Sequence, residues 1–104
     1  MNIIEGSQEN FEKEVLRANV PVLVDFNASW CPPCRALHPT LEAMAADSDD
    51  YKIVTVDVDS EKALAASYDI SSIPCLIVFK DGVETDRRIG LQPRKRLEKM
   101  LGVR

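Results

Sequence analysis

Two cysteines separated by two residues are the part of this sequence best suited to chemistry. Cys31 and Cys34 enclose the pair Pro32-Pro33. The thiolate is the nucleophile in thiol chemistry. Reversible disulfide exchange also needs a second thiol nearby, because that thiol must attack the mixed disulfide formed by the first. The pair therefore predicts a site of thiol–disulfide exchange.

A buried strand is expected just before the cysteines. The run Val22–Phe26 is apolar except for one carboxylate, Asp25. Such a short, nearly continuous apolar run is typical of a strand that is covered on both faces. A buried carboxylate is costly unless it is paired or its protonation is used. Asp25 is therefore a candidate functional residue; the alternative is an exposed strand residue.

A helix is expected just after the cysteines. From Cys34 onward the apolar residues Leu37, Leu41 and Met44 recur every three or four positions. This period predicts a helix from about Pro33 to Ala46, with a kink at Pro39. Cys31 would then lie at the helix N-terminus, where free backbone N–H groups and the helix dipole favour a thiolate.

The rest of the chain predicts an α/β fold. Further strands are expected at 3–4, 51–58, 75–79 and 83–89. Helices are expected after the potential caps Ser7 and Ser60 and from about Pro93. Asp81-Gly82 is a hairpin signal, so the last two strands should pair antiparallel. The order predicts a three-layer fold, with a central mixed sheet of about five strands and helices on both faces.

Composition narrows the function classes. The 104 residues are expected to form a single domain, 1–104. The net charge is −4, from 13 basic and 17 acidic residues, which argues against a nucleic-acid partner. No run reaches membrane-spanning length and no secretory signal is visible, so we expect a cytoplasmic protein with no membrane contact. Three cysteines are an odd number, which argues against a disulfide-stapled scaffold.

The chain resembles the thioredoxin family along almost its whole length. A Cys-x-x-Cys pair beside a βαβ pattern is a known thioredoxin-like signature. The matching stretches are Val24-Asp25-Phe26, Ala28-x-Trp30-Cys31-x-Pro33-Cys34, Pro39, Asp57-Val58-Asp59, Ile73-Pro74, Phe79-Lys80-x-Gly82 and Gly90. The resemblance implies a thioredoxin-like fold and an enzyme that reduces disulfides in protein substrates. It also implies a monomer without a bound cofactor, which a separate thioredoxin reductase returns to the dithiol form.

The same resemblance implies roles for individual residues. Cys31 would be the attacking thiol and Cys34 the resolving thiol. Asp25 would handle the proton of Cys34, and Pro74 would be a cis proline facing the disulfide. The substrate-binding residues would be Trp30, Pro32, Ile73 and Gly90.

Four positions depart from the family pattern. Pro32 replaces the usual glycine between the cysteines, and Asn27 stands where a second tryptophan is common. Thr55 replaces a lysine near the buried aspartate, and Cys75 replaces a threonine after Pro74. These departures bear on the redox potential and the set of partners.

Other interpretations of these residues stay open at this point. Cys31 and Cys34 could be packing residues, and Pro74 could be an ordinary trans proline. Cys75 is interpreted as a small apolar strand residue, with a third redox thiol as the alternative. His38 lies four residues after Cys34, on the same helix face. A zinc or iron–sulfur module could therefore use Cys31, Cys34, Cys75 and His38.

Overall fold

A mixed sheet forms the centre of the molecule in a computed structural model, which describes residues 2–103. Its strands are β1 (Ile4–Glu5), β2 (Val22–Asn27), β3 (Lys52–Asp57), β4 (Cys75–Lys80) and β5 (Val83–Ile89). They lie in the order β1-β3-β2-β4-β5. The β1–β3 and β2–β3 pairs are parallel, whereas β2–β4 and β4–β5 are antiparallel. The predicted mixed sheet of about five strands is confirmed.

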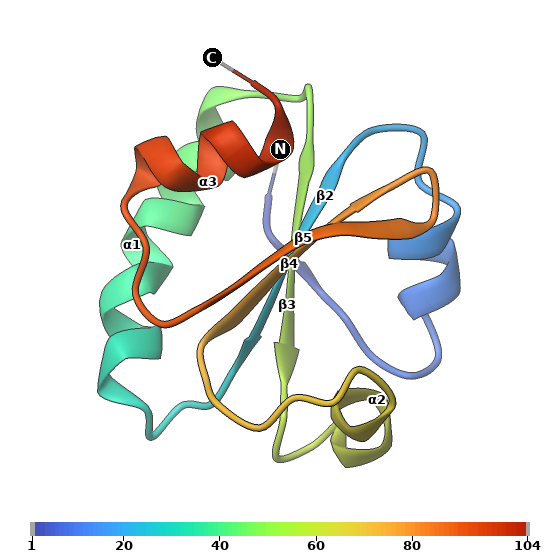
Figure 1. Ribbon diagram of the computed structural model, residues 1–104, viewed down its shortest axis with the longest axis vertical. Helices are drawn as coiled ribbons and strands as arrows, with labels where there is room; N and C mark the ends of the chain where they lie inside the picture. Colours follow the sequence, from blue (N-terminus) through green and yellow to red (C-terminus); the bar gives the residue numbers. More distant parts are fainter. Residues whose placement is uncertain (1, 104) are drawn as a thin grey trace.

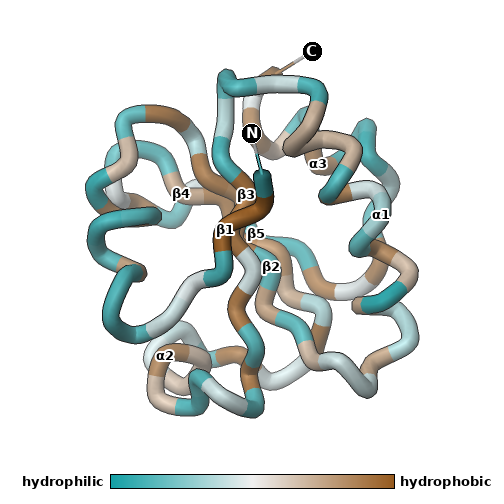
Figure 2. The backbone as a smooth tube through the Cα atoms, turned by 180° about the vertical axis from the view of Figure 1, so that it is seen from behind, coloured by the Kyte–Doolittle hydropathy of each residue, from teal (hydrophilic) through white to brown (hydrophobic). Residues whose placement is uncertain are grey.

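Helices cover both faces of the sheet (Figure 1). On one face lie α1 (Pro32–Asp47) and α3 (Arg94–Leu101), and on the other lie the π-helical turn η1 (Glu12–Leu16) and α2 (Lys62–Ser67). Each face has its own apolar core, one beneath α1 and α3 and one beneath η1 and α2. Figure 2 shows hydrophobic stretches along β1 and β3, inside the more polar chain around them. None of the helices in residues 2–103 is long and apolar enough to cross a membrane.

Strand β2 alternates between the two cores. Val24 and Phe26 pack in the core beneath η1 and α2, whereas Leu23 packs in the core beneath α1. Successive side chains of a strand point to opposite faces. Asp25 and Asn27, two and four residues after Leu23, therefore share the face that α1 covers.

The helix starts differ in detail from the predicted ones. Helix α1 begins at Pro32, one residue early, and continues through Pro39. The predicted cap Ser60 is wrong: Glu61 precedes α2, and the Ser60 hydroxyl instead donates to the backbone oxygen of Asp57. A serine hydroxyl can bond locally in this way and then is not available as a cap.

The first helix also begins later than predicted. Ser7 and Asn10 form a reciprocal pair: Ser7 Oγ accepts from the Asn10 N–H, and Asn10 Oδ1 accepts from the Ser7 N–H. This is a capping-box arrangement with asparagine in place of the usual glutamate. The Ser7 cap therefore stabilises a turn that precedes η1 rather than the first residue of the helix itself.

The predicted hairpin joins β4 to β5. Asp81 and Gly82 have φ angles of 53° and 80°, the left-handed pair that a two-residue type I′ turn requires. Glycine is needed at the second position for space as well, since a Cβ there would lie 2.8 Å from the Leu16 carbonyl oxygen.

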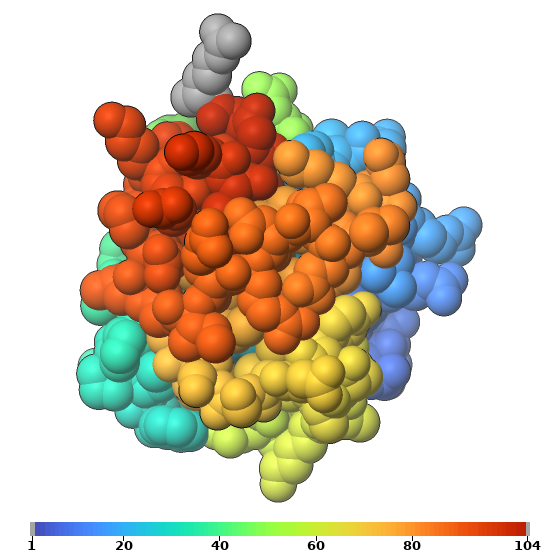
Figure 3. Space-filling model, in the orientation of Figure 1, coloured from blue at the N-terminus to red at the C-terminus, as the bar shows by residue number. Residues whose placement is uncertain are grey.

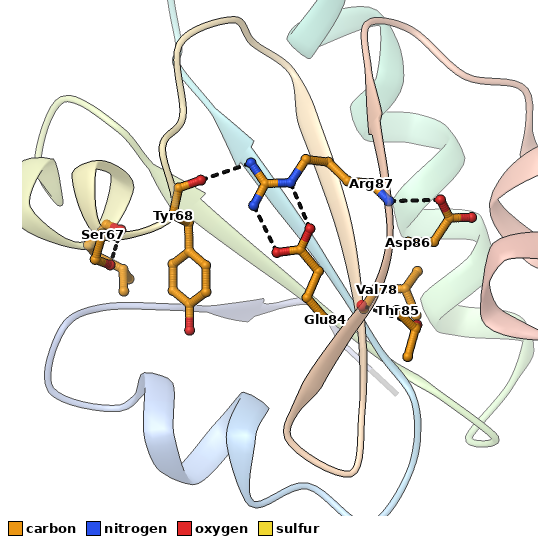
Figure 4. A network of polar contacts seen from close by, with 8 residues as sticks. Ser67, Tyr68, Val78, Glu84, Thr85, Asp86 and Arg87 are labelled. Carbon is orange, nitrogen blue, oxygen red and sulfur yellow. Dashed lines mark hydrogen bonds and ion pairs between the residues drawn. The ribbon is translucent and has the colours of Figure 1, made fainter.

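Strand β5 lies on the surface, between α3 and α2 (Figure 3). Arg87 of β5 donates to the backbone oxygen of Tyr68 at the end of α2, over 2.8 Å (Figure 4). Its guanidinium also forms two hydrogen bonds with the Glu84 carboxylate. Such paired bonds fix a guanidinium in one orientation. Arg87 thereby ties β5 to the segment that leads from α2 towards Pro74.

Candidate active site

The two cysteines lie at the N-terminus of α1, as predicted. Cys31 is the N-cap residue, and its Sγ accepts a hydrogen bond of 3.4 Å from the backbone N–H of Cys34. Proline has no N–H, so neither Pro32 nor Pro33 can add a donor. Both thiols are free and each cysteine is only 4% exposed. Exposure therefore does not distinguish an attacking thiol from a resolving thiol. Any difference between the two cysteines must come from the groups around each sulfur.

The surroundings of Cys34 keep its thiol protonated. Burial, and after it the hydrogen bond with Cys31, raise the pKa of Cys34 to about 12. A backbone hydrogen bond involving Ala28 opposes this rise, while the charges of Cys31 and Asp25 add to it. Cys34 thus holds its proton at neutral pH and needs a base before it can act as a nucleophile.

Asp25 is buried beside this pair, so the alternative of an exposed strand residue is wrong. The residue is 1% exposed, and burial raises the pKa of its carboxyl from 3.8 to about 6. Asn27 Nδ2 donates to Asp25 Oδ2 over 3.0 Å, which acts against the rise. Within residues 2–103, Asp25 Oδ1 has no hydrogen-bond partner. A carboxyl with a pKa near 6 can accept and return a proton close to neutral pH.

The loop before β4 covers the other side of Cys31. The Ile73–Pro74 peptide bond is cis, so the trans alternative is wrong. Cys31 Sγ lies 3.9 Å from the carbonyl oxygen of Ile73. The N–H of Gly90 donates to the carbonyl oxygen of Pro74 over 2.8 Å. The fold therefore brings together Cys31, Ile73, Pro74 and Gly90 from three separate stretches of the chain.

Exposed apolar groups flank the site. Trp30, directly before Cys31, is 65% exposed, and its indole Nε1 donates to Asp59 Oδ2 over 2.7 Å. Leu91, directly after Gly90, is 54% exposed. Pro32 is exposed as well. The sequence reasoning did not identify Leu91 or the contact between Trp30 and Asp59, although an apolar residue next to Gly90 was a usable signal.

Cys75 faces away from the other two cysteines. It packs in the core beneath η1 and α2, whereas its neighbour Leu76 packs beneath α1. Burial raises the pKa of the Cys75 thiol, which disfavours the reactive thiolate. Among residues 2–103, no group of three His, Cys, Asp or Glu side chains could hold a metal ion. His38 instead lies 3.8 Å from Glu42. The proposed Cys₃His set is therefore not assembled.

Comparisons with known proteins agree with this geometry. The family model for thioredoxin matches residues 2–102. A thioredoxin of Chlamydia trachomatis is 47% identical over 95 residues, covering 91% of both chains. Thioredoxin C-2 of Corynebacterium nephridii is 45% identical over 96 residues, covering 91% of this chain and 89% of its own.

A solved structure matches the fold as well as the sequence. It is a mutant thioredoxin from Halobacterium salinarum NRC-1, with a TM-score of 0.88 and 32% identity. The match covers 96% of this chain and 88% of the other. The chain therefore belongs to the thioredoxin family and, with it, is a thiol–disulfide oxidoreductase.

Proposed function

We propose that this protein reduces disulfides in protein substrates by a two-step exchange through Cys31 and Cys34. The Cys31 thiolate attacks a substrate disulfide, forms a mixed disulfide and releases one substrate thiolate. Asp25 then takes the proton of Cys34, and the Cys34 thiolate attacks Cys31 Sγ. The second substrate thiolate leaves, and two electrons have passed to the substrate while the Cys31–Cys34 disulfide forms.

The unequal surroundings of the two sulfurs are the observation that carries this assignment. Cys31 Sγ accepts the Cys34 N–H at the positive end of α1, an arrangement that stabilises negative charge on sulfur. The Cys34 thiol, with its pKa of about 12, remains protonated beside a carboxyl whose pKa is about 6. One cysteine is thus set up to attack first, and the other to wait for a base.

Substrate binding is assigned to the surface around Cys31. Trp30 and Pro32 are exposed on one side of the cysteine, and Ile73 and Gly90 lie on the other. An extended substrate segment would cross the loop before Pro74 to bring its disulfide to Cys31. Pro74, which is buried, would support this loop from beneath rather than bind substrate through its side chain.

The remaining assignments concern the setting of the reaction. A separate thioredoxin reductase would return the disulfide form to the dithiol, since the two electrons must be replaced after each turnover. We assign the whole chain, 1–104, to one domain, because the family model spans residues 2–102. We also propose a cytoplasmic monomer: all three cysteines are free, so the fold does not depend on an oxidising compartment.

A direct assay of disulfide reduction tests this function. Insulin, reduced by a dithiol buffer, precipitates as its chains separate, and the protein should shorten the time to precipitation. A variant with both cysteines replaced by serine serves as the control and should act no faster than the buffer alone. Equal rates for wild type and control would contradict the proposal.

Replacing Pro32 by glycine should raise the reduction potential of the couple. The backbone N–H of Cys34 is the first one after Cys31, and glycine would add another next to the attacking sulfur. A hydrogen bond to a charged group contributes roughly 1.5 kcal/mol, which corresponds to about 30 mV for this two-electron couple. Stabilising the thiolate favours the dithiol, so the potential should rise by a few tens of millivolts.

The measurement is an equilibration of each protein with a common dithiol–disulfide buffer. Pro32→Ala is the matched variant, because it adds the same N–H without the flexibility of glycine. The reduction potential should rise in both variants. It should rise more in Pro32→Gly than in Pro32→Ala if the stiffness of the loop also favours the disulfide. A potential equal to or below that of wild type in both variants would show that the missing donor is unimportant.

Replacing Cys75 by valine should leave disulfide reduction unchanged. The side chain is 2% exposed and packs among apolar residues on the face of the sheet opposite α1. A swap of similar size between apolar side chains costs less than about 1.5 kcal/mol of stability. Insulin reduction and urea unfolding measure the two effects separately. A variant that folds normally yet loses most of its activity would make Cys75 a third redox thiol.

A further inference from the structure

Asn27 contacts Asp25, the buried acidic residue of the site. Its Nδ2 donates to Asp25 Oδ2 over 3.0 Å. The two residues are spaced by two along β2, so both side chains lie on the face covered by α1. Asn27 is half-buried at the end of the strand, whereas Asp25 is 1% exposed. Asn27 therefore lies between the buried carboxyl and the surface.

The contact makes the two carboxyl oxygens unequal. Oδ2 is occupied by an amide N–H, a donor that does not give up its proton near neutral pH. Oδ1 has no hydrogen-bond partner within residues 2–103. The amide thus fixes the orientation of the carboxyl and leaves one oxygen able to receive a proton.

Few other groups around Asp25 can donate a hydrogen bond that orients its carboxyl. On the flanking strands its register partners are Thr55 of β3 and Leu76 of β4, neither of which is charged. From α1, His38 acts on the pKa of Asp25 electrostatically, and Asp25 in turn acts on the pKa of Cys34. The structure gives Asp25 no side-chain hydrogen bond from a lysine or arginine of residues 2–103, so an uncharged amide serves as its donor.

An open cavity of about 510 Å³ joins this region to solvent. Asn27, Cys34 and Thr55 line it, so it reaches the resolving cysteine as well as the end of β2. Its acidic and basic lining residues are Glu5, Arg35, His38, Asp57 and Glu61. The cavity is wide enough for several waters. Asp25 does not line it, so a proton from bulk solvent would reach the carboxyl past Asn27 or Cys34.

We propose that Asn27 is the positioning residue for proton transfer in this enzyme. It holds Oδ2 of Asp25, presents Oδ1 to the proton of Cys34, and stabilises the carboxylate form that acts as the base. This inference rests on the proposed role of Asp25. It assigns to an amide on β2 a function that the sequence pattern alone left without an interpretation.

Replacing Asn27 by leucine removes the donor at nearly constant size. A hydrogen bond to the charged form lowers an acid's pKa, so its loss should raise the titration midpoint of Asp25 by about one pH unit. Asn27→Ala also lacks the donor and should show the same rise, which separates the donor from the bulk of leucine. Carbon-13 NMR of the labelled Asp25 carboxyl measures this midpoint in the dithiol protein.

The resolving step supplies the second readout. Cys31 is first linked to a coloured aromatic thiol, and attack by Cys34 then releases that thiol at a measurable rate. The acid limb of the pH–rate profile should move upward together with the NMR midpoint. In the Asp25→Asn background the Asn27→Leu change should alter the rate by less than about twofold, since coupled residues act through one another.

The outcomes distinguish a failure of the Asn27 role from a failure of the Asp25 role on which it rests. If Asp25→Asn removes the acid limb but neither Asn27 variant moves it, Asn27 has no positioning role. If Asp25→Asn leaves the acid limb in place, the proposed role of Asp25 is itself wrong. The expected rise of the Asp25 titration midpoint in Asn27→Leu would not then support a role in proton transfer. An equal effect of Asn27→Leu with and without Asp25 would also overturn the inference.

Discussion

Serine at position 34 should trap this enzyme on its substrates, whereas serine at position 31 should trap nothing. With Cys34→Ser, Cys31 can still attack a substrate disulfide, but no second thiol is present to release the product. With Cys31→Ser, the remaining thiol of Cys34 keeps the burial that is the largest cause of its raised pKa, so it should stay protonated at neutral pH. Turnover should fall by about a thousandfold or more in both variants, as expected when a nucleophile is removed.

Insulin and non-reducing electrophoresis give a direct readout of the trapped species. Cys34→Ser should accumulate a covalent adduct that a dithiol dissolves, and the double serine variant should form none. Mass spectrometry of the adduct should place the link at Cys31. An adduct formed through Cys34 in the Cys31→Ser variant would reverse the order of attack.

The trapping experiment tests which of the two thiols attacks first. The two cysteines are equally buried, each with 4% of its surface exposed. The order of attack therefore rests on charge and hydrogen bonding alone: the Cys34 N–H that Cys31 Sγ accepts, and the burial that raises the pKa of Cys34. On the proposed function, a substrate would reach Cys31 past Trp30, which is exposed, and past the Ile73 loop.

Local patterns were sufficient to predict the elements that hold the site. The apolar run of β2 indicated a strand buried on both faces, and the spacing of three and four after Cys34 indicated α1. The Asp81-Gly82 pair indicated the hairpin, because few residues other than glycine, asparagine and aspartate tolerate positive φ. Each of these signals is contained within a few neighbouring residues.

Contacts between distant residues could not be predicted in the same way. Trp30 and Asp59 are 29 residues apart, and nothing in either segment specifies their hydrogen bond. The Ser60 cap was wrong because its hydroxyl had a competing local acceptor at Asp57. In the sequence, Asn27 stands out only as a departure from the family pattern. Its hydrogen bond with Asp25 is explained once both residues are placed on the same face of β2.

Replacing Asp25 by asparagine should slow the resolving step by about a hundredfold, the usual contribution of a general base. The first attack by Cys31 should change far less, because that step needs no proton from Cys34. Release of a coloured thiol from Cys31 isolates the resolving step, and the initial reaction with the disulfide reagent measures the attack. An unchanged resolving rate at all pH values around the carboxyl pKa would remove Asp25 from the mechanism.

The same substitution should stabilise the fold at neutral pH. Burial raises the pKa of Asp25 from 3.8 to about 6, so the folded state holds this proton more tightly than the unfolded state does. Between these two values the unfolded carboxyl ionises first, and the stability of the wild type falls as the pH rises. Above this range the carboxyl is ionised in both states, and the raised pKa then lowers the free energy of unfolding of the wild type by about 3 kcal/mol. Asparagine carries no charge, so the variant should gain up to that amount at neutral pH.

Urea unfolding of both reduced proteins across this range tests the argument. Well below pH 3.8 the Asp25 carboxyl is neutral in both states, so wild type and Asp25→Asn should have similar free energies of unfolding. The two curves should then separate up to about pH 6 and stay parallel above it. Curves that remain parallel throughout would mean that Asp25 does not carry the titration. A variant that is both slower and more stable would instead show that the buried carboxyl is retained for proton transfer at the expense of stability.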